Sequence, residues 1–356
     1  MMNVTSILHK GEKIFDRTKI RIKKRFDLFE PIIIYPYYGY ANDQKVHIQG
    51  RVIEQEGILD TDKAPESIRK KLWYMFRRYE SDEVPHAEVQ VVLMNKTFHI
   101  KANEEGFIDE YLPLPKPFPG KEGNWHKIPL RIIHNVFTAQ KNICAEADIM
   151  VPDKKAKFGI ISDVDDTIVH SFATNTYLKF KTLLLKNAKG RVPFKGVEEF
   201  YKKLQTAHGS FNPLFFVSGS TWNVYDLLKR FCLFHDIPRA PFFLREFGLN
   251  SNFIIQRKTR VFKKEKIRHL FSFYPELSFI CIGDSGQHDP EIYTDMAEKY
   301  PGRIKAIYIR RVNNKKISKK RKELKERLKK QDIPIMFIHD TSEALNHARK
   351  NNYISA

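Results

Sequence analysis

Two aspartates and a threonine occupy alternate positions within the segment Ile160–Ile168. They are Asp163, Asp165 and Thr167, and a short apolar run precedes them. In an extended segment every second side chain points to the same side, so these three can converge on one point. Clustered carboxylates suit a hard divalent cation and a phosphoryl group, and an aspartate can also attack phosphorus itself. A strand that ends in an Asp-rich turn gives the same pattern, so this segment alone leaves both interpretations open.

Three further groups of polar residues follow along the chain. Ser218 and Gly219 end the run LFFVSGS, where a hydroxyl and an accessible backbone can bind phosphate oxygens. Lys263 belongs to a basic cluster that begins a helical pattern, and a lysine there can neutralise a phosphate and a nucleophile. Asp284 ends the run LSFICIGD, and Asp289 follows a short loop, so both can complete a Mg²⁺ site. Each of these groups, taken alone, has an ordinary structural explanation. Their occurrence together and in this order is what indicates a site for phosphoryl transfer.

The second half of the chain predicts how these residues come together. From about Pro152–Lys155 onward, apolar runs alternate with helical patterns, which is typical of a parallel sheet with helices on both faces. The runs are FGIISD, PLFFVSGS, APFFLRE, LSFICIGDSG, IKAIYIR and IPIMFIHD. In such folds ligands bind beyond the carboxyl ends of the strands. Asp163, Ser218, Arg245 and Asp284 stand at these ends, and we expect the site there.

The first half of the chain predicts a different architecture. Residues 31–152 contain short runs rich in β-branched and aromatic residues with turn signals between them, which indicates a mainly β, sandwich-like domain. Residues 153–356 form the predicted α/β domain. Within it, residues 169–194 are a long insert after the first strand, which we expect to be a small cap over the site. Plain packing of a helix onto the domain explains this insert equally well.

The net charge of +20 over 356 residues predicts attraction to polyanions. Residues 1–30 are basic with interspersed apolar side chains, and residues 310–330 are strongly basic, with only Glu323 and Glu326 opposing. Either segment can lie on an anionic membrane surface, and a solvated helix fits each pattern equally well. Because no nucleic-acid-binding module accompanies them, the sequence favours a membrane over a nucleic acid as partner.

Cysteine usage and the length of the apolar runs indicate the compartment. The three cysteines, Cys144, Cys232 and Cys281, stand in apolar stretches without metal-ligand spacing, so we expect reduced packing residues. No apolar run reaches the length of a membrane span, and residues 1–30 lack the features of a signal peptide. We therefore expect a cytoplasmic protein, with peripheral association to a membrane as an open alternative.

The combined motifs resemble the haloacid dehalogenase superfamily. DVDDTI is similar to its first motif, Ser218 to the second, Lys263 to the third and GDSGQHD to the acidic fourth. The chain resembles more closely the actin patch protein family of phosphatidate phosphatases, through ISDVDDTIVHS, NPLFFVSGSTWNVYDLL, FFLREFGL and IGDSGQHDPEIY. PYYGYANDQKVHIQGRVI is similar to the start of the β-rich domain in bacterial members. The resemblance extends from about residue 35 to residue 310, and lipins share the core more distantly.

The resemblance implies a role for each acidic residue. Asp163 would be the nucleophile, and Asp165 would be the general acid and later the general base. Mg²⁺ would be held by Asp163, the backbone carbonyl of Asp165 and Asp284. Asp289 would be either a direct ligand of the ion or a partner of one.

The resemblance also implies which residues bind the phosphoryl oxygens. They are Ser218 with Gly219, and Lys263, which is preferred to Lys264 because it stands four residues before Ile267. Thr167 would fix the phosphate-binding loop by hydrogen bonding.

Two positions depart from the pattern of many relatives: Thr221 replaces a proline, and Phe247 replaces a tryptophan. Trp222 and Arg245 are candidate contacts at the substrate rim, and a structural role for either is equally open.

The implied function is Mg²⁺-dependent hydrolysis of a lipid phosphate monoester, phosphatidate to diacylglycerol, through an aspartyl-phosphate. Two other functions remain open. One is a phosphatase for a soluble or nucleic-acid phosphate monoester, and the other is a non-catalytic module that binds lipid phosphate. The presence of Asp163, Asp165, Lys263 and Asp284 together argues against the non-catalytic alternative.

Overall fold

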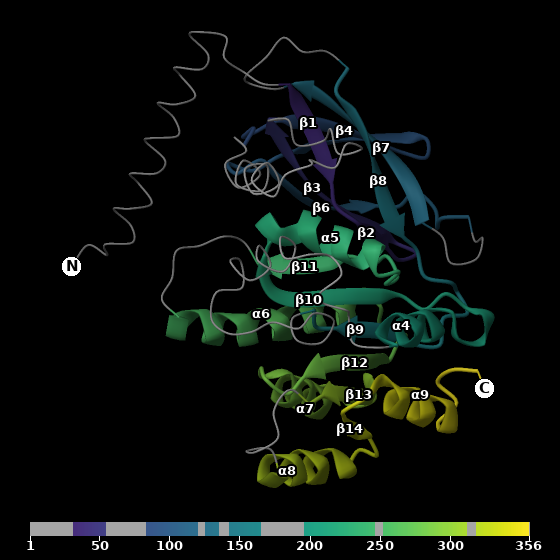
Figure 1. Ribbon diagram of the computed structural model, residues 1–356. Coiled ribbons are helices and arrows are strands. Elements are labelled where there is room, and N and C mark those ends of the chain that lie inside the picture. The colour runs from purple at the N-terminus through teal and green to yellow at the C-terminus, as the bar shows by residue number, and fades with distance from the viewer. Residues whose placement is uncertain are drawn as a thin grey trace.

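A computed structural model describes residues 31–54, 83–119, 125–134, 142–164, 196–245, 252–311 and 318–355. Figure 1 shows a β-rich part, which comes first in the chain, and an α/β part, which follows it. A mainly β first part and an α/β second part are as the sequence predicts. The predicted basic segment 1–30 and the predicted cap 169–194 lie outside the described residues.

The β-rich part forms one hydrogen-bonded sheet around a core of aliphatic side chains. Its strands pair in the order β1-β3-β2-β8-β7-β4-β5, and β6 pairs with β3. All described pairings are antiparallel except that of β2 with β8. The two separate sheets of a sandwich are therefore not seen among the described strands. The strands are β1 (Ile32–Pro36), β2 (Gly39–Ala41), β3 (Lys45–Glu54), β4 (Glu88–Leu93), β5 (Lys96–Lys101), β6 (Phe107–Pro113), β7 (Trp125–His134) and β8 (Cys144–Met150).

The α/β part contains a parallel sheet of six strands in the order β11-β10-β9-β12-β13-β14. The central strands are apolar and buried, because helices cover both faces of the sheet. The strands are β9 (Gly159–Ser162), β10 (Leu214–Thr221), β11 (Phe242–Arg245), β12 (Phe279–Asp284), β13 (Ile304–Arg310) and β14 (Ile335–Ile338). From β9 the chain continues to β10 and β11 on one side of the sheet, and then crosses to β12, β13 and β14 on the other side. The direction of the strand order therefore changes next to β9, and ligands of such sheets bind at this point.

The helices divide between two hydrophobic cores, one on each face of the parallel sheet. One core holds side chains of α4 (Val197–Gln205), α5 (Tyr225–Phe234) and α9 (Thr341–Lys350). The other holds side chains of α6 (Asn252–Phe273), α7 (Asp289–Lys299) and α8 (Ser318–Lys329). Two short 3₁₀ helices, η1 (Ala207–Gly209) and η2 (Trp222–Val224), complete the described elements.

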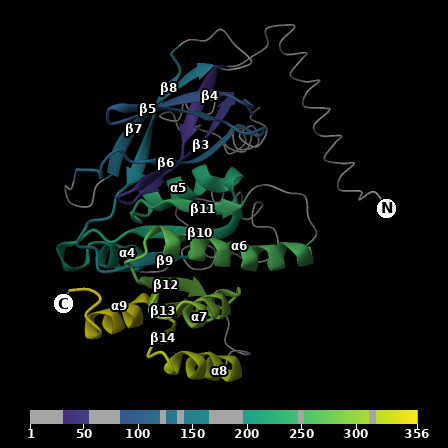
Figure 2. The same cartoon turned by 180° about the vertical axis from the view of Figure 1, so that it is seen from behind.

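The β-rich sheet packs against the α/β part on the side of α5, as both views show (Figures 1 and 2). Tyr37 belongs to the core that contains α5, and Tyr40 and Met150 belong to the core that contains α6. The two parts therefore share buried side chains.

Two details correct the sequence analysis. The helix that carries Lys263 begins at Asn252 and not at the basic cluster, because neither glycine nor proline interrupts residues 252–263. Cys232 and Cys281 are buried as expected, but Cys144 is exposed. Cys144 is the first residue of β8 and pairs with Arg131 of β7. No helix within the described ranges combines the length and apolar character needed to cross a bilayer.

Candidate active site

The carboxyl ends of two central strands bring Asp163 and Asp284 together. Asp163 directly follows β9, and Asp284 is the last residue of β12. These strands are parallel neighbours, and the Asp163 N–H donates a 2.9 Å hydrogen bond to the Ile282 carbonyl. Both carboxylates are fully buried. Burial of charged groups requires compensating partners, so groups of opposite charge or hydrogen-bond donors are expected close to this edge of the sheet.

Lys263, from the middle of α6, supplies one such partner. Its Nζ lies 2.7 Å from Asp163 Oδ1 and 2.6 Å from Asp289 Oδ1, and its side chain is 2% exposed. Burial lowers the pKa of Lys263, but the charges of Asp163 and Asp289 outweigh that effect and hold the pKa above its ordinary value. Lys263 is therefore a buried cation that links the strand end to α7.

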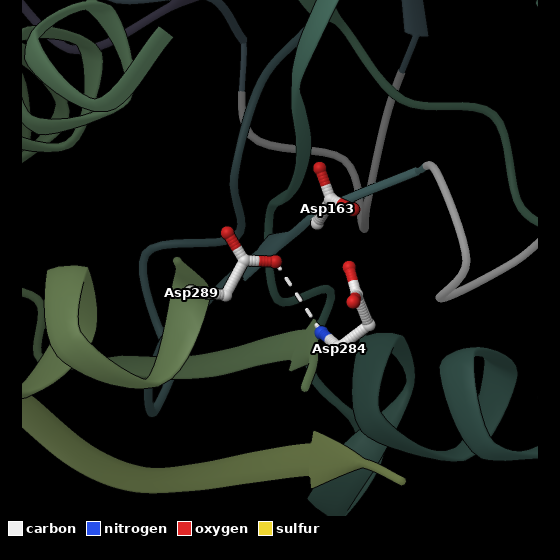
Figure 3. Close-up of side chains that lie close together, drawn as sticks. All are labelled: Asp163, Asp284 and Asp289. Atoms are coloured by element: carbon white, nitrogen blue, oxygen red, sulfur yellow. Dashed lines mark hydrogen bonds between the residues drawn. The ribbon is translucent and has the colours of Figure 1, made fainter. Parts of the chain in front are cut away.

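Asp289 enters the cluster from the first turn of α7 (Figure 3). The Asp284 backbone N–H donates a 3.3 Å hydrogen bond to Asp289 Oδ2. A Cβ atom at Gly283 would lie 2.6 Å from Asp289 Oδ2 and 2.7 Å from Asp289 Cβ. Only glycine therefore lets Asp289 approach the strand so closely.

The loop after β12 fixes the orientation of Asp284. Its Oδ1 accepts hydrogen bonds from the N–H groups of Gly286, at 2.5 Å, and Gln287, at 2.9 Å. An aspartate that binds the backbone two and three residues ahead stabilises a tight turn. The GDSGQHD segment thus holds Asp284 and Asp289 in one geometry.

Within the described ranges, one group of three metal-ligating side chains lies close enough to hold a cation. It consists of Asp163, Asp284 and Asp289, each offering a carboxylate oxygen within 4.8 Å of the others. Lys263 balances one of the three carboxylates when all are ionised, which leaves two negative charges for a bound cation to neutralise. All the donors are hard oxygens. The residues present therefore fit a divalent cation such as Mg²⁺.

Ser218 lies at the same edge of the sheet. It is fully buried in β10, two residues beyond Phe216, which pairs with Ser162 of β9. The Ser220 N–H donates a 2.9 Å hydrogen bond to Ser218 Oγ. A Cβ atom at Gly219 would lie 2.7 Å from a methyl carbon of Thr259, so α6 also packs closely against this segment.

The two candidate rim residues make structural contacts. Trp222 stacks on Tyr37 of the β-rich part, with ring centroids 4.6 Å apart and ring planes at 5°. The Arg245 guanidinium donates a 2.9 Å hydrogen bond to Thr259 Oγ1. The structure thus brings Asp163, Lys263, Asp284 and Asp289 into direct or close contact and gives Trp222 and Arg245 separate partners.

Asp165 and Thr167, two further predicted site residues, lie outside the described residues. Two contributors were not singled out from the sequence. Thr259 contacts both Gly219 and Arg245, and Tyr37 stacks on Trp222. No local pattern marks either residue, because each contact joins segments far apart in the chain.

A hollow of about 340 Å³ lies elsewhere, near the amino ends of the parallel strands. Its lining comprises Lys157, Phe158, His208, Lys305, Asn352 and Tyr353. Phe158 directly precedes β9, and Lys305 is near the start of β13, so this hollow is at the edge opposite the carboxylates. We assign the chemistry to the carboxylate cluster, because ligands of parallel sheets bind at the carboxyl ends.

The fold and the cluster define a class: α/β proteins with a cation-suited acidic site at the carboxyl ends of a parallel sheet. Residues 158–311 match the family described as "Phosphatidate phosphatase APP1, catalytic domain". The similarity to the APP1 family is thus shown for residues 158–311, which are somewhat less than half of the chain. The match covers the strands and helices that hold Asp163, Lys263, Asp284 and Asp289.

Two curated relatives are similar to parts of the chain. Phosphatidate phosphatase APP1 of Saccharomyces cerevisiae is 35% identical over 157 residues, which cover 44% of this chain and 26% of that protein. An uncharacterised protein of Schizosaccharomyces pombe is 25% identical over 219 residues, 60% of this chain and 34% of that protein. The chain thus spans about a quarter to a third of the length of these relatives.

Among solved structures, a carbohydrate acetylesterase from Xanthomonas citri aligns with 88% of this chain and 72% of its own at 12% identity. The TM-score is 0.32, too low to support any conclusion about fold or function.

Proposed function

We propose that the chain is a Mg²⁺-dependent phosphatase that hydrolyses a lipid phosphate monoester, with phosphatidate as substrate and diacylglycerol as product. The observation that carries the proposal is the buried cluster of Asp163, Lys263, Asp284 and Asp289 inside the segment that matches the APP1 catalytic domain. The name of the yeast relative suggests the substrate, and the cluster has the residue types that phosphoryl transfer needs. We also assign the α/β part to the haloacid dehalogenase superfamily, on its motifs and strand order.

In the proposed reaction, a carboxylate oxygen of Asp163 attacks phosphorus and the bond from phosphorus to the ester oxygen breaks. The leaving alkoxide takes a proton from Asp165, which acts as general acid. A water molecule then attacks the aspartyl-phosphate and gives a proton to Asp165, now the general base. The bond from phosphorus to Asp163 breaks, inorganic phosphate leaves, and both aspartates return to their starting states.

Charge compensation at the cluster supports this chemistry. Asp163, the backbone carbonyl of Asp165 and Asp284 would hold Mg²⁺, which when bound neutralises charge on the phosphoryl oxygens. Asp289 already contacts Lys263 and the Asp284 N–H, which suits a residue that orients the site rather than a direct ligand.

We propose that other residues at the carboxyl edge of the parallel sheet bind the phosphate. Lys263, Ser218 and the backbone at Gly219 would bind the phosphoryl oxygens, and Thr167 would fix the loop. The proposed domain division is residues 31–152 and 153–356, with residues 169–194 as a small cap.

Peripheral binding to an anionic membrane is part of the proposal, since the substrate is a lipid. In the described part of α8, Leu324 and Leu328 are buried, while Lys322, Lys325 and Lys329 are exposed. Each exposed lysine near an anionic surface contributes about 1 kcal/mol of attraction. We place the protein in the cytoplasm, at the membrane surface during turnover.

The test is phosphate release with Mg²⁺ from phosphatidate in mixed micelles and from a soluble phosphate monoester. Wild type is compared with Asp163→Asn and with Asp332→Asn, which makes the same chemical change at an exposed residue. We expect release from phosphatidate that Asp163→Asn abolishes and Asp332→Asn leaves intact.

Other results would change the assignment. Preference for the soluble ester, or for a nucleic-acid terminal phosphate, would keep the mechanism and overturn the lipid substrate. Binding of phosphatidate without any release from wild type would make the chain a non-catalytic lipid-phosphate-binding module.

A further inference from the structure

A tyrosine-rich connector joins β1 to β2 and contacts the α/β part. The connector has the sequence YPYYGY, residues 35–40. Tyr37, at its centre, is 5% exposed and packs in the core that contains α5. Its ring lies 4.6 Å from the Trp222 ring in a parallel stack and 4.3 Å from the Tyr225 ring. The β-rich sheet thus touches the segment that directly follows Ser218, Gly219 and Ser220.

Hydrogen bonds from β3 hold the connector in place. The Tyr37 N–H donates to the Gln49 carbonyl at 2.9 Å. The buried Gln49 side chain donates to the Tyr38 carbonyl at 2.7 Å. Tyr37 is therefore fixed within the β-rich sheet, and its ring presents a rigid surface to Trp222.

The neighbouring tyrosines attach the start of α5 to the same sheet. Tyr35 donates a 2.9 Å hydrogen bond to Asp226 Oδ1. The Tyr38 N–H donates a 2.9 Å hydrogen bond to the Tyr225 hydroxyl. η2 contains Trp222, and α5, which follows it directly, begins with Tyr225 and Asp226. The connector therefore contacts the chain just beyond the end of β10.

The end of β10 needs such support because its backbone leaves the regular ladder. The pairing of β10 with β11 shifts register between Val217 and Thr221. Ser218 and Gly219 lie within this irregular stretch, where the regular register of the strand pair is interrupted. Thr259 of α6 packs against Gly219, and Tyr37 packs against Trp222. The Ser218–Trp222 segment is thus held between α6 and the β-rich sheet.

We propose that Tyr37 is a positioning residue that, by holding Trp222, sets the geometry with which the Ser218–Trp222 segment binds a phosphoryl group. The β-rich sheet then serves the active site directly and is not an independent binding module. This inference rests on the proposed function, in which Ser218 and Gly219 bind the phosphoryl oxygens.

Binding of inorganic phosphate in the presence of Mg²⁺, measured by titration calorimetry, tests the proposal without requiring turnover. The variants are Tyr37→Ala, which removes the stack, and Tyr37→Phe, which keeps the ring. Leu130→Ala is the control, because it truncates a buried side chain of the β-rich core away from the connector. If Tyr37→Ala does not fold, Tyr37→Leu replaces it, since it keeps an apolar side chain without a ring.

We expect Tyr37→Ala to weaken phosphate binding about three- to tenfold, the range that loss of an aromatic pair gives. Tyr37→Phe and Leu130→Ala should bind phosphate as wild type does, although Leu130→Ala unfolds at a lower temperature. Where wild type releases phosphate from an ester, Tyr37→Ala should also raise KM more than it lowers kcat.

Three results would overturn the inference. Unchanged phosphate affinity in Tyr37→Ala would make the stack purely structural. Equal weakening in Leu130→Ala would trace the effect to general loss of stability. If wild type did not bind phosphate at all, the phosphate site and the proposed function would both be wrong. In the first two results wild type still binds phosphate, so only the role of Tyr37 would be overturned.

Discussion

At the scale of single residues, Lys263 compensates two buried carboxylates, those of Asp163 and Asp289. Lys263→Met should leave both without their cation. Removal of one partner of a buried ion pair costs about 3–5 kcal/mol, so we expect a loss of that size in the free energy of unfolding without Mg²⁺. Because Mg²⁺ would neutralise the same carboxylates, it should restore more stability to this variant than to wild type. Urea unfolding with and without Mg²⁺ measures both effects.

Lys264→Met is the matched control for this experiment. Lys264 is the next residue of α6, is partly exposed and pairs with Asp295 instead of the cluster. Mg²⁺ should stabilise this variant no more than wild type. An equal Mg²⁺ response in Lys263→Met and Lys264→Met would contradict a shared site for the ion and Lys263.

Gly283 is the residue that admits Asp289 to the cluster, since a Cβ atom there would collide with the Asp289 side chain. Gly283→Ala should displace Asp289 and weaken Mg²⁺ binding roughly 10- to 100-fold, the usual cost of disturbing groups that orient metal ligands. Calorimetric titration with Mg²⁺ measures this change. Ile282→Val, at the preceding position of β12, is the control and should keep the wild-type affinity. Unchanged affinity in Gly283→Ala would argue that Asp289 does not orient the ion site.

At the scale of elements, Asp295 of α7 joins three helices. Its carboxylate accepts hydrogen bonds from Arg260 and Lys264 of α6 and from Arg327 of α8. Partial burial raises the pKa of Asp295, but these hydrogen bonds outweigh it and lower the pKa to about 2. A depressed carboxyl pKa stabilises the fold above the ordinary value of 3.8, and this contribution is lost as the pH falls towards 2.

Asp295→Asn should therefore destabilise the protein near neutral pH. Because water reaches these side chains and screens the charges, we expect a loss of only about 1–2 kcal/mol in the free energy of unfolding. Urea unfolding at pH 7 measures the loss, which should shrink as the pH approaches 2. Glu326→Gln, at an exposed position of α8, should have no comparable effect. A difference from wild type that persists at pH 2 would show that the ionised carboxylate is not its cause.

At the scale of the whole molecule, His269 of α6 lies at the contact with the β-rich sheet. Its Nε2 is 2.8 Å from the Tyr40 hydroxyl and 3.0 Å from the Tyr111 hydroxyl. Burial, and to a lesser extent His47, Lys266 and Lys45, lower the pKa of His269 to about 4, while Asp109 opposes them. The folded protein therefore keeps His269 neutral at a pH where the unfolded chain would bind a proton.

The consequence is a loss of stability on acidification. Between the ordinary histidine pKa of 6.5 and about 4, the unfolded state binds more protons than the folded state, so stability falls as the pH falls. His269→Gln should reduce this dependence and move the change in Tm between pH 6.5 and pH 4.5 by at least about 2 °C. Thermal unfolding across this range provides the measurement. His339→Gln, at an exposed histidine, should retain the wild-type profile, and an identical profile for both variants would exclude His269 as the source.

The sequence predicted the parallel sheet, because buried parallel strands are continuous apolar runs that alternate with helical patterns. It also predicted that Asp163 and Asp284 stand at strand ends, since each directly terminates an apolar run. Ser218 was expected at a strand end too, but β10 continues beyond it to Thr221. The sequence did not locate the start of α6. The basic cluster at Lys263 resembles the start of a helix, but the helix begins at Asn252 and runs through the polar residues before that cluster.

The sequence by itself determined the set of residues proposed for the chemistry and predicted at which edge of the sheet Asp163 and Asp284 lie, because strand periodicity and motif spacing are local properties. Only the tertiary structure decided that Lys263 lies between Asp163 and Asp289 and that Tyr37 stacks on Trp222. These contacts join segments far apart in the chain, and they depend on how α6 and the β-rich sheet pack against the parallel sheet. No local pattern encodes that packing, because it results from the complementary shapes of surfaces that meet only in the folded molecule.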